Sequence, residues 1–443
     1  MSTSGTQVQT ALPDNRSTLF LISVLALFTA ATAFSLRIAA SGAIKEALFD
    51  PVDIANSGRM IGDALGAAFL GFAGALLISS PLLDVVGTKR VFLLSAAAFV
   101  VGAVTILMAP EIASGSGVVS IVWWGMLLSG VGWGCAEAAI NPLTAAIYPE
   151  EKTHRMNVLH AWWPAGIIIG GLSSLMLFQT FDFDWRIAIV LPILPALVFG
   201  GLAISQSFPV TAAPARDHNY LDMLMVVVRR PTFWIFFAIM FLTASSELAP
   251  ASWVDVALTQ TVKMPGVVVL IYVAAIMFVM RHFAGALAER LSDMGLLWAS
   301  TIPTALGLYL LSTADSPLTA LLAATAWAVG VCYMWPTMLA AVAQRYPEGG
   351  PWTIGLTAFA GALAIYFVLP QLGAIYDQAK FESAGGIEAF GALSPASGEM
   401  AQVLAYAASV SFRAVAVIPM ILFGIFGAVW LVERRRGRPL GQQ

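Results

Sequence analysis

The sequence predicts an all-α membrane protein in which twelve transmembrane helices form two pseudo-symmetric six-helix bundles. Of the 443 residues, 59% are hydrophobic and only 11% are charged, whereas a soluble domain carries about 25% charged residues. The apolar residues gather in runs close to the roughly 20 residues that a spanning helix needs. Short motifs at the ends of these runs also recur in the second half of the chain. A helical bundle solvated by lipid, with an internal repeat, accounts for all three observations.

The predicted elements follow the apolar runs in chain order. A cytoplasmic tail, residues 1–17, precedes an N-terminal bundle, residues 18–205, with helices near 18–43, 60–83, 91–109, 118–147, 157–178 and 186–205. The polar segment 206–230 is predicted to be a cytoplasmic linker. The C-terminal bundle, residues 231–432, has helices near 231–257, 266–288, 295–313, 318–345, 353–374 and 406–432, and the basic tail 433–443 follows. We expect an outer loop over residues 376–402, with room for a short surface helix.

The distribution of basic residues predicts the orientation of the chain. Lys and Arg are more frequent in segments on the side of the two termini than in the opposite segments. Because cytoplasmic loops carry the excess of basic residues, we expect both termini in the cytoplasm and a multi-pass protein of a bacterial-type inner membrane. The first sixteen residues lack the basic region of a cleaved signal peptide, so the first helix is expected to be retained.

Several functional classes find no support in the sequence. The formal net charge of −3 argues against nucleic-acid binding, which needs a concentrated basic face. The chain has neither a Gly-x-x-x-x-Gly-Lys-Ser/Thr phosphate loop nor a His-Glu-x-x-His zinc motif. Cys135 and Cys332 lie in separate apolar runs, which indicates helix packing rather than metal binding. We therefore predict a protein that is not an enzyme and holds no cofactor or metal.

Two motifs recur between the halves. Leu83–Arg90, after the second predicted helix, places an acid and a base at the same helix end as Gly285–Arg290 does after the eighth. Tyr-Pro-Glu ends both the fourth helix, at Tyr148, and the tenth, at Tyr346. Paired membrane repeats are typical of secondary transporters, whose binding site lies between the repeats near the middle of the membrane.

Two segments resemble a known family. The run from Asp84 to Arg90 resembles the cytoplasmic loop motif of the major facilitator superfamily. Gly132–Pro142, which reads Gly-Trp-Gly-Cys-Ala-Glu-Ala-Ala-Ile-Asn-Pro, resembles the fourth helix of the fucose/galactose/glucose–proton symporter family, to which fucose permease belongs. His160 and Trp163 stand where that family has a glutamine and a substrate-binding asparagine. The resemblance implies the major facilitator fold, a monomer and transport by alternating access.

The resemblance also assigns a gating role to charges at the cytoplasmic ends of the second and eighth helices. Pairs of these charges are expected to hold the cytoplasmic side closed in one state and to break in the other. The predicted gating residues are Asp84, Lys89, Arg90, Glu289 and Arg290.

Glu137 is the first candidate for proton coupling. It lies well inside the fourth apolar run, where a charge costs about 2.5–3.5 kcal/mol or more, so it is expected to face a cavity. A carboxyl that meets two aqueous spaces in turn can load a proton on one side and release it on the other. In the resembled family the matching glutamate takes part in proton coupling. The alternative is a protonated glutamate that only bonds one helix to another.

His160 and Glu247 are the other two candidates for proton coupling. An imidazole titrates near neutral pH and can relay protons. Glu247 lies in a polar stretch of the seventh helix that ends at Pro250, and we expect this helix to be broken there and to line the cavity. Glu247 could instead form a structural ion pair with Arg281 or Arg37.

Six residues are predicted to bind substrate. Asn141 lies four residues after Glu137 and therefore on the same helix face, and the indole of Trp163 could stack on a sugar ring. Arg281 could neutralise Glu247 or bind an anion, and Trp335 occupies the repeat position of Glu137. Helix capping, packing and snorkelling are the structural alternatives for members of this set. The predicted substrate-binding residues are Asn141, Asn157, Trp163, Arg37, Arg281 and Trp335.

These residues together predict proton-coupled import of a small polar solute, such as a sugar, by alternating access. The partners are the substrate, protons and the lipid bilayer. An organic-anion symporter or a proton-antiport exporter of the same fold is an open alternative. A solute sensor that binds ligand without transporting it is an alternative from another class.

Overall fold

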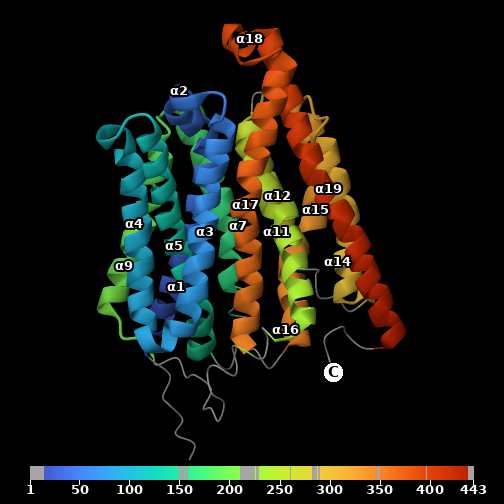
Figure 1. Ribbon diagram of the computed structural model, residues 1–443. Helices are drawn as coiled ribbons and strands as arrows, with labels where there is room; N and C mark the ends of the chain where they lie inside the picture. The colour runs from blue at the N-terminus through green and yellow to red at the C-terminus, as the bar shows by residue number, and fades with distance from the viewer. Residues whose placement is uncertain are drawn as a thin grey trace, which may run out of the picture.

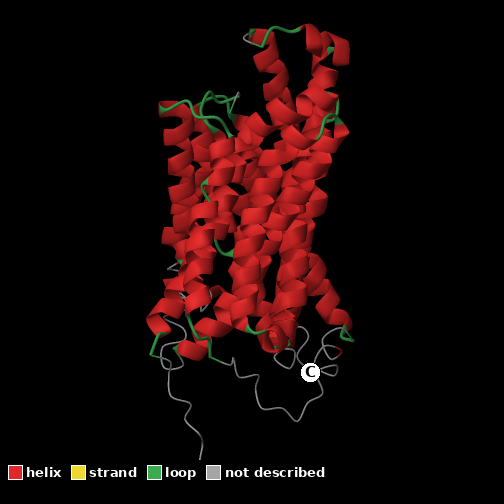
Figure 2. Ribbon diagram, turned by 90° about the vertical axis from the view of Figure 1, so that its left-hand side faces the viewer, coloured by secondary structure: helices red, strands yellow, loops and turns green. Residues whose placement is uncertain are grey.

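The computed structural model describes residues 14–148, 155, 158–209, 225, 229–259, 261–281, 287, 290–346, 350–395 and 397–437. Within these residues the secondary structure is entirely helical (Figure 2). Eleven of the described helical segments are long and apolar enough to cross a membrane, and the shorter apolar helix α12 (Gly266–Arg281) brings the described set to twelve. The chain is therefore a multi-pass membrane protein, as the apolar runs predict.

The first half of the chain supplies six crossings. Helix α1 continues through a π-helical turn, Lys45–Phe49, into the short helix α2 (Asp50–Asp53). A second π-helical turn, Met176–Thr180, extends α7, and the sixth crossing is divided at Pro192 into α8 and α9. The bounds are α1 (Arg16–Ile44), α3 (Ser57–Val86), α4 (Thr88–Ile112), α5 (Ser116–Ile147), α7 (Trp162–Leu175), α8 (Arg186–Val190) and α9 (Ile193–Ser205).

The second half supplies the other six crossings. Helices α15 and α16 together form one crossing, interrupted at Cys332 and Tyr333. Besides α12, the bounds are α11 (Pro231–Leu258), α14 (Asp293–Leu311), α15 (Pro317–Val331), α16 (Met334–Arg345), α17 (Gly350–Ala384), α18 (Ile387–Ala392) and α19 (Gly398–Arg436). The two halves lie side by side, with α1–α9 in blue to green and α11–α19 in yellow to red (Figure 1).

The expected outer loop over residues 376–402 is largely wrong. Helix α17 continues to Ala384 and α19 begins at Gly398, so both extend beyond the other helices and are joined through the short helix α18 (Figure 1). Helix α18 is the short surface helix for which the loop left room. The first residues of the predicted C-terminal basic tail, Glu433 to Arg436, continue helix α19.

The predicted break of the seventh helix at Pro250 is wrong as well. Helix α11 runs through Pro250 without interruption. A proline removes the N–H that would bond the carbonyl four residues earlier, which here is the carbonyl of Ser246. Trp327 of α15 donates its indole N–H to that oxygen across 3.1 Å. A donor from a neighbouring helix thus replaces the missing one and keeps α11 continuous.

The ends of the fourth and tenth crossings have matching geometry. Tyr148 follows α5 with φ −130° and ψ 61°, and Tyr346 follows α16 with φ −131° and ψ 58°. Each tyrosine packs edge-on against a phenylalanine near the start of its own half, at centroid distances of 5.6 Å to Phe20 and 5.6 Å to Phe233. This correspondence supports the internal duplication inferred from the repeated motifs.

The halves touch closely on one side of the molecule. Helix α1 begins and α19 ends on the same side, at the bottom in Figure 1, which we call the terminal side; the opposite side is the far side. On the far side, Arg59 of α3 donates its backbone N–H to Asp377 of α17, and Gly42 of α1 donates its backbone N–H to Asp255 of α11. A Cβ at Gly58 would lie only 2.6 Å from an Asp377 oxygen. Small residues therefore let the halves meet there.

The terminal side is more open. Gly373 of α17 packs against the Gly58 carbonyl on the far side, whereas a Cβ at Gly355, a buried residue five turns away on the same face of α17, would meet no other atom within 4 Å. In the first half, His160 is exposed and Glu137 and Asn141 are partly exposed. The space between the halves is thus closed on the far side and accessible from the terminal side.

Candidate functional site

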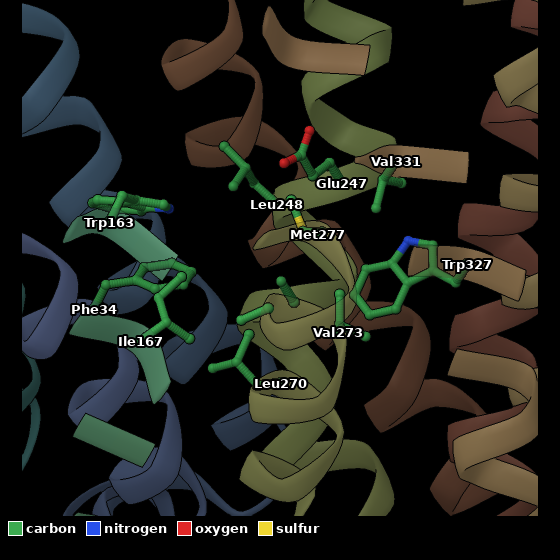
Figure 3. A pocket seen from close by; sticks show the side chains of 12 residues that line it. Phe34, Trp163, Ile167, Glu247, Leu248, Leu270, Val273, Met277, Trp327 and Val331 are labelled. Atoms are coloured by element: carbon green, nitrogen blue, oxygen red, sulfur yellow. The ribbon is translucent and has the colours of Figure 1, made fainter. Parts of the chain in front are cut away.

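A cavity lies between the two halves, on the terminal side of the far-side contacts. Its empty volume is about 370 Å³, a figure that includes space open to solvent. Helices α1 and α7 form one wall, and helices α11, α12 and α15 form the other (Figure 3). The lining residues are Phe34, Trp163, Ile167, Glu247, Leu248, Ala251, Leu270, Val273, Ala274, Met277, Trp327 and Val331.

An aromatic cluster supports the wall of the first half. The ring of Trp163 stacks on Trp133 of α5, with centroids 4.9 Å apart, and Trp133 stacks in turn on Phe72 of α3 at 4.2 Å. Phe34 of α1 lies 5.8 Å from Trp163. Because these packed rings come from four helices, the face of Trp163 is positioned before any ligand arrives.

Glu247 is the only charged residue that lines this cavity in the described part of the chain. Its side chain is 8% exposed, and Oε1 lies 3.6 Å from Nη2 of Arg281, which is 29% exposed. Among the described residues, Oε2 is buried and has no hydrogen-bond partner, although the backbone N–H of Trp335 approaches the same carboxyl. The ion pair predicted as an alternative is therefore present, and one carboxyl oxygen remains able to accept a hydrogen bond.

Arg281 is fixed by the interruption between α15 and α16. Its Nε donates to the carbonyl of Cys332 across 3.1 Å. This carbonyl has no helical partner because the residue four positions later, Pro336, lacks an N–H. The same principle operates at Ser246 and Pro250, so two prolines beside the cavity free carbonyls that side chains of neighbouring helices then occupy.

Three predicted residues form a hydrogen-bonded chain in the first half. Asn141 Nδ2 donates to Oε1 of Glu137 across 3.5 Å, and His160 Nε2 lies 2.8 Å from Oδ1 of Asn141. Since an amide oxygen only accepts, Nε2 of His160 carries the proton in this contact. Glu137 lies one turn closer to the terminal side than Trp133, so the chain links the level of the aromatic cluster to an exposed imidazole.

Glu137, Asn141 and His160 are not among the residues that line the cavity, and other predicted substrate residues also lie outside its lining. Arg37 is 6% exposed and donates to the Ser129 hydroxyl of α5, so it packs inside the first half rather than extending outward. The ring of Trp335 packs against Gly361 of α17. Asn157 lies outside the described residues. Trp163 lines the cavity, and Arg281 reaches it through Glu247.

The predicted gating residues are described only in part. Lys89 donates to the carbonyls of Ile204 and Gln206 at the end of α9, and Arg90 donates to the Val86 carbonyl of its own half. Arg290 is exposed, whereas Glu289 and the side chain of Asp84 lie outside the described part. With the terminal side open, Lys89 and Arg90 thus bond within the first half, and their gating role stays a prediction.

The sequence reasoning missed Phe34, Trp327 and the far-side carboxylates Asp255 and Asp377. The two aromatic residues look like ordinary apolar residues of a spanning helix, so they gave no signal. The four-residue spacing of Gly58, Gly62 and Gly66 could have indicated the α3–α17 contact, because small residues at that spacing mark close helix packing. Nothing in the sequence pairs the two aspartates with backbone N–H groups of the other half.

The chain matches one protein-family model and is similar in fold to several solved transporters. The family model described as Major Facilitator Superfamily matches residues 17–376. Among curated proteins, none matches the chain at a significant level. A solved D-xylose–proton symporter superposes with a TM-score of 0.72 at 12% identity, covering 91% of this chain and 97% of that one.

Two further solved structures are similar in fold. The nucleoside transporter NupG has a TM-score of 0.69 at 11% identity, with 93% of this chain and 99% of the other covered. The E. coli fucose–proton symporter FucP has a TM-score of 0.54 at 15% identity, with coverage of 91% and 98%. At these identities the likeness establishes the fold alone.

Proposed function

The chain belongs to the Major Facilitator Superfamily, and from this premise we propose that it imports a small hydroxylated solute together with protons. It is a transporter rather than an enzyme, and its fold is that of sugar, nucleoside and other solute transporters. Symport, the sugar-like solute, the inner-membrane location, the cytoplasmic termini and the monomeric state are parts of the proposal. In this orientation the terminal side is the cytoplasmic side, and the structure is an inward-open state.

The observation that carries the proposal is the hydrogen-bonded chain Glu137–Asn141–His160 of the first half, whose members are not among the residues that line the cavity. A carboxyl inside the membrane is costly when charged, so its protonation can be linked to which side of the membrane it faces. In the inward-open state Glu137 is partly exposed and accepts from Asn141, whose own oxygen accepts from the exposed His160, so the carboxyl would release its proton to water on the cytoplasmic side. In the outward-open state Glu137 would load a proton from outside.

The solute would bind across the cavity. Trp163 and Phe34 would contact its apolar face from the first half, and Glu247 would accept a hydrogen bond from its hydroxyl in the second half. Because both halves touch the same molecule, its binding favours the arrangement in which they close around it. Rocking of the halves then exposes the solute to the opposite side.

Glu137→Gln tests the coupling directly. The amide keeps the shape and the contact with Asn141 but does not ionise at neutral pH. In proteoliposomes we expect the variant to exchange labelled solute across the membrane, while it loses the accumulation driven by an inward proton gradient. Glu111→Gln, at the exposed end of α4, is the matched control and should behave as the unmodified protein. Undiminished gradient-driven accumulation by Glu137→Gln would refute the proposed role of this residue.

A further inference from the structure

Resting on the proposed function, we infer that the solute is a neutral molecule with a flat, largely apolar body and hydrogen-bond donors gathered at one end. A nucleoside or an aryl glycoside has this chemistry, and a free hexose does not. The inference comes from how apolar, polar and charged groups are distributed around the cavity.

The cavity walls suit a flat apolar body. Trp163 and Phe34 lie on one side and Trp327 on the other, with aliphatic side chains such as Leu270 and Val273 between them (Figure 3). Trp327 is fully buried and its indole N–H is already bonded to the Ser246 carbonyl. It therefore offers the cavity only its ring. Aromatic walls of this kind favour a ligand that can stack or pack edge-on.

The polar end of the cavity is confined to one level. Figure 3 shows Glu247 at one end of the cavity and Leu270 at the other. Leu270 lies about one turn from Gly266, which packs against Val254 and Asp255 on the far side, so the end at Glu247 is the one nearest the terminal side. Oε2 of Glu247 is buried and lacks a hydrogen-bond partner among the described residues. A buried acceptor without a donor is unfavourable, so a ligand O–H or N–H placed there would restore the missing bond. The donors of the ligand should therefore be gathered at the end that faces the terminal side.

The charge of the site favours a neutral ligand. Arg281 is shared between Glu247 and the carbonyl of Cys332, so the pair has no net charge. A carboxylate or phosphate group at this level would meet Glu247, while the guanidinium that could neutralise it is already engaged. This charge distribution favours a neutral solute over the organic anions that the sequence left open as alternative substrates.

A free hexose fits these walls poorly. It carries hydroxyl groups around the whole ring, and those that face Trp327, Leu270 or Ile167 would lose water without gaining a partner. Each such loss weakens binding. A molecule that has its hydroxyls at one end and a ring at the other avoids this loss and buries more apolar surface.

Two matched pairs of probes test the inference: uridine against D-ribose, and phenyl β-D-glucopyranoside against D-glucose. Each pair shares a sugar and differs in the flat body. Binding is measured by titration calorimetry on the purified full chain in detergent, at one pH and without a gradient. We expect the ring-bearing member of at least one pair to bind about tenfold more tightly or better.

Variants of Trp163 connect this preference with the cavity. Trp163→Ala should reduce the preference to near unity, Trp163→Phe should retain most of it, and Trp124→Ala, a tryptophan exposed on the outer face of α5, should leave it unchanged. Equal or tighter binding of the free sugars overturns the inference. So does the absence of binding by both ring-bearing probes at millimolar concentration, or a preference that survives Trp163→Ala.

The binding experiment is independent of proton coupling. If the ring-bearing probes bind preferentially but cross the membrane without protons, the inference holds and the proposed symport fails. If the free sugars bind better and their uptake follows the proton gradient, the symport holds and the inference fails.

Discussion

The carboxyl of Glu247 and the guanidinium of Arg281 depend on each other at the wall of the cavity. Glu247 is almost fully buried, and Arg281 is its only cationic partner among the described residues. Removing one charge from such a pair leaves the other buried without compensation, whereas removing both leaves no uncompensated charge. The pair therefore stabilises the fold mainly because each charge compensates the burial of the other, and less through their net attraction.

A double-mutant cycle tests this dependence. We expect Arg281→Ala to lower the thermal stability of the detergent-solubilised protein, and Glu247→Gln in the same chain to restore part of it. The interaction free energy of the cycle should be about 1 kcal/mol or more, measured by thermal unfolding under identical conditions. Arg186 and Asp184, an exposed ion pair at 2.9 Å, provide the control cycle, which should be close to zero. Additive effects of Arg281→Ala and Glu247→Gln would show that the charges do not interact.

At this scale the sequence predicted residues on a common helix face better than contacts between helices. The four-residue spacing of Glu137 and Asn141 placed them together, and the structure has them within hydrogen-bond reach. The sequence did not indicate that Trp327 donates to the carbonyl left free by Pro250, because Trp327 and this turn of α11 meet only after folding. For the same reason the repeat position of Trp335 predicted that it lies at the site, whereas its ring packs on Gly361.

Helices α3 and α17 pack closely against each other on the closed far side. Gly58, Gly62 and Gly66 of α3 each approach backbone or side-chain atoms of α17, and a Cβ at Gly62 would meet the carbonyl of Leu369. Such close contact depends on the absence of side chains. Added bulk there should favour the state in which these helices separate, which in the proposed orientation is the outward-open state of an alternating-access cycle.

Gly373→Ala and Gly355→Ala form a matched pair on one face of α17. A Cβ at residue 373 would meet the Gly58 carbonyl, and a Cβ at residue 355 would meet nothing within 4 Å. With Ala251→Cys as a reporter in the cavity wall, a membrane-impermeant maleimide is applied from the far side. We expect faster labelling in Gly373→Ala and no change in Gly355→Ala. Equal labelling rates in the two variants would mean that this contact does not hold the far side closed.

At the scale of elements, the sequence predicted the number and order of crossings because each needs a long apolar run. The sequence predicted helix ends less well where a helix continues, with polar residues, beyond its apolar run. The polar residues after Tyr376 led to a loop, yet α17 and α19 continue there and are joined through α18. Hydropathy predicts which segments span the membrane, but it does not predict where a helix ends outside the membrane.

The molecule as a whole shows two related halves that meet on one side and leave a cavity accessible from the other. Matching tyrosine–phenylalanine contacts at the ends of α5 and α16 support a common origin of the halves. The motifs indicated this repeat from the sequence alone. The distribution of open and closed sides could not be predicted from sequence, because both states of a transporter share one sequence.

The central claim is that solute and protons cross together in the same direction, and a proton-pulse measurement tests it most directly. Uridine, or phenyl β-D-glucopyranoside if it binds more tightly, is added to lightly buffered, de-energised cells that produce the protein, and the external pH is recorded. We predict a transient rise in external pH that is absent with Glu137→Gln and present with Glu111→Gln. Entry of the labelled probe with no pH change, or with acidification of the medium, would contradict the account.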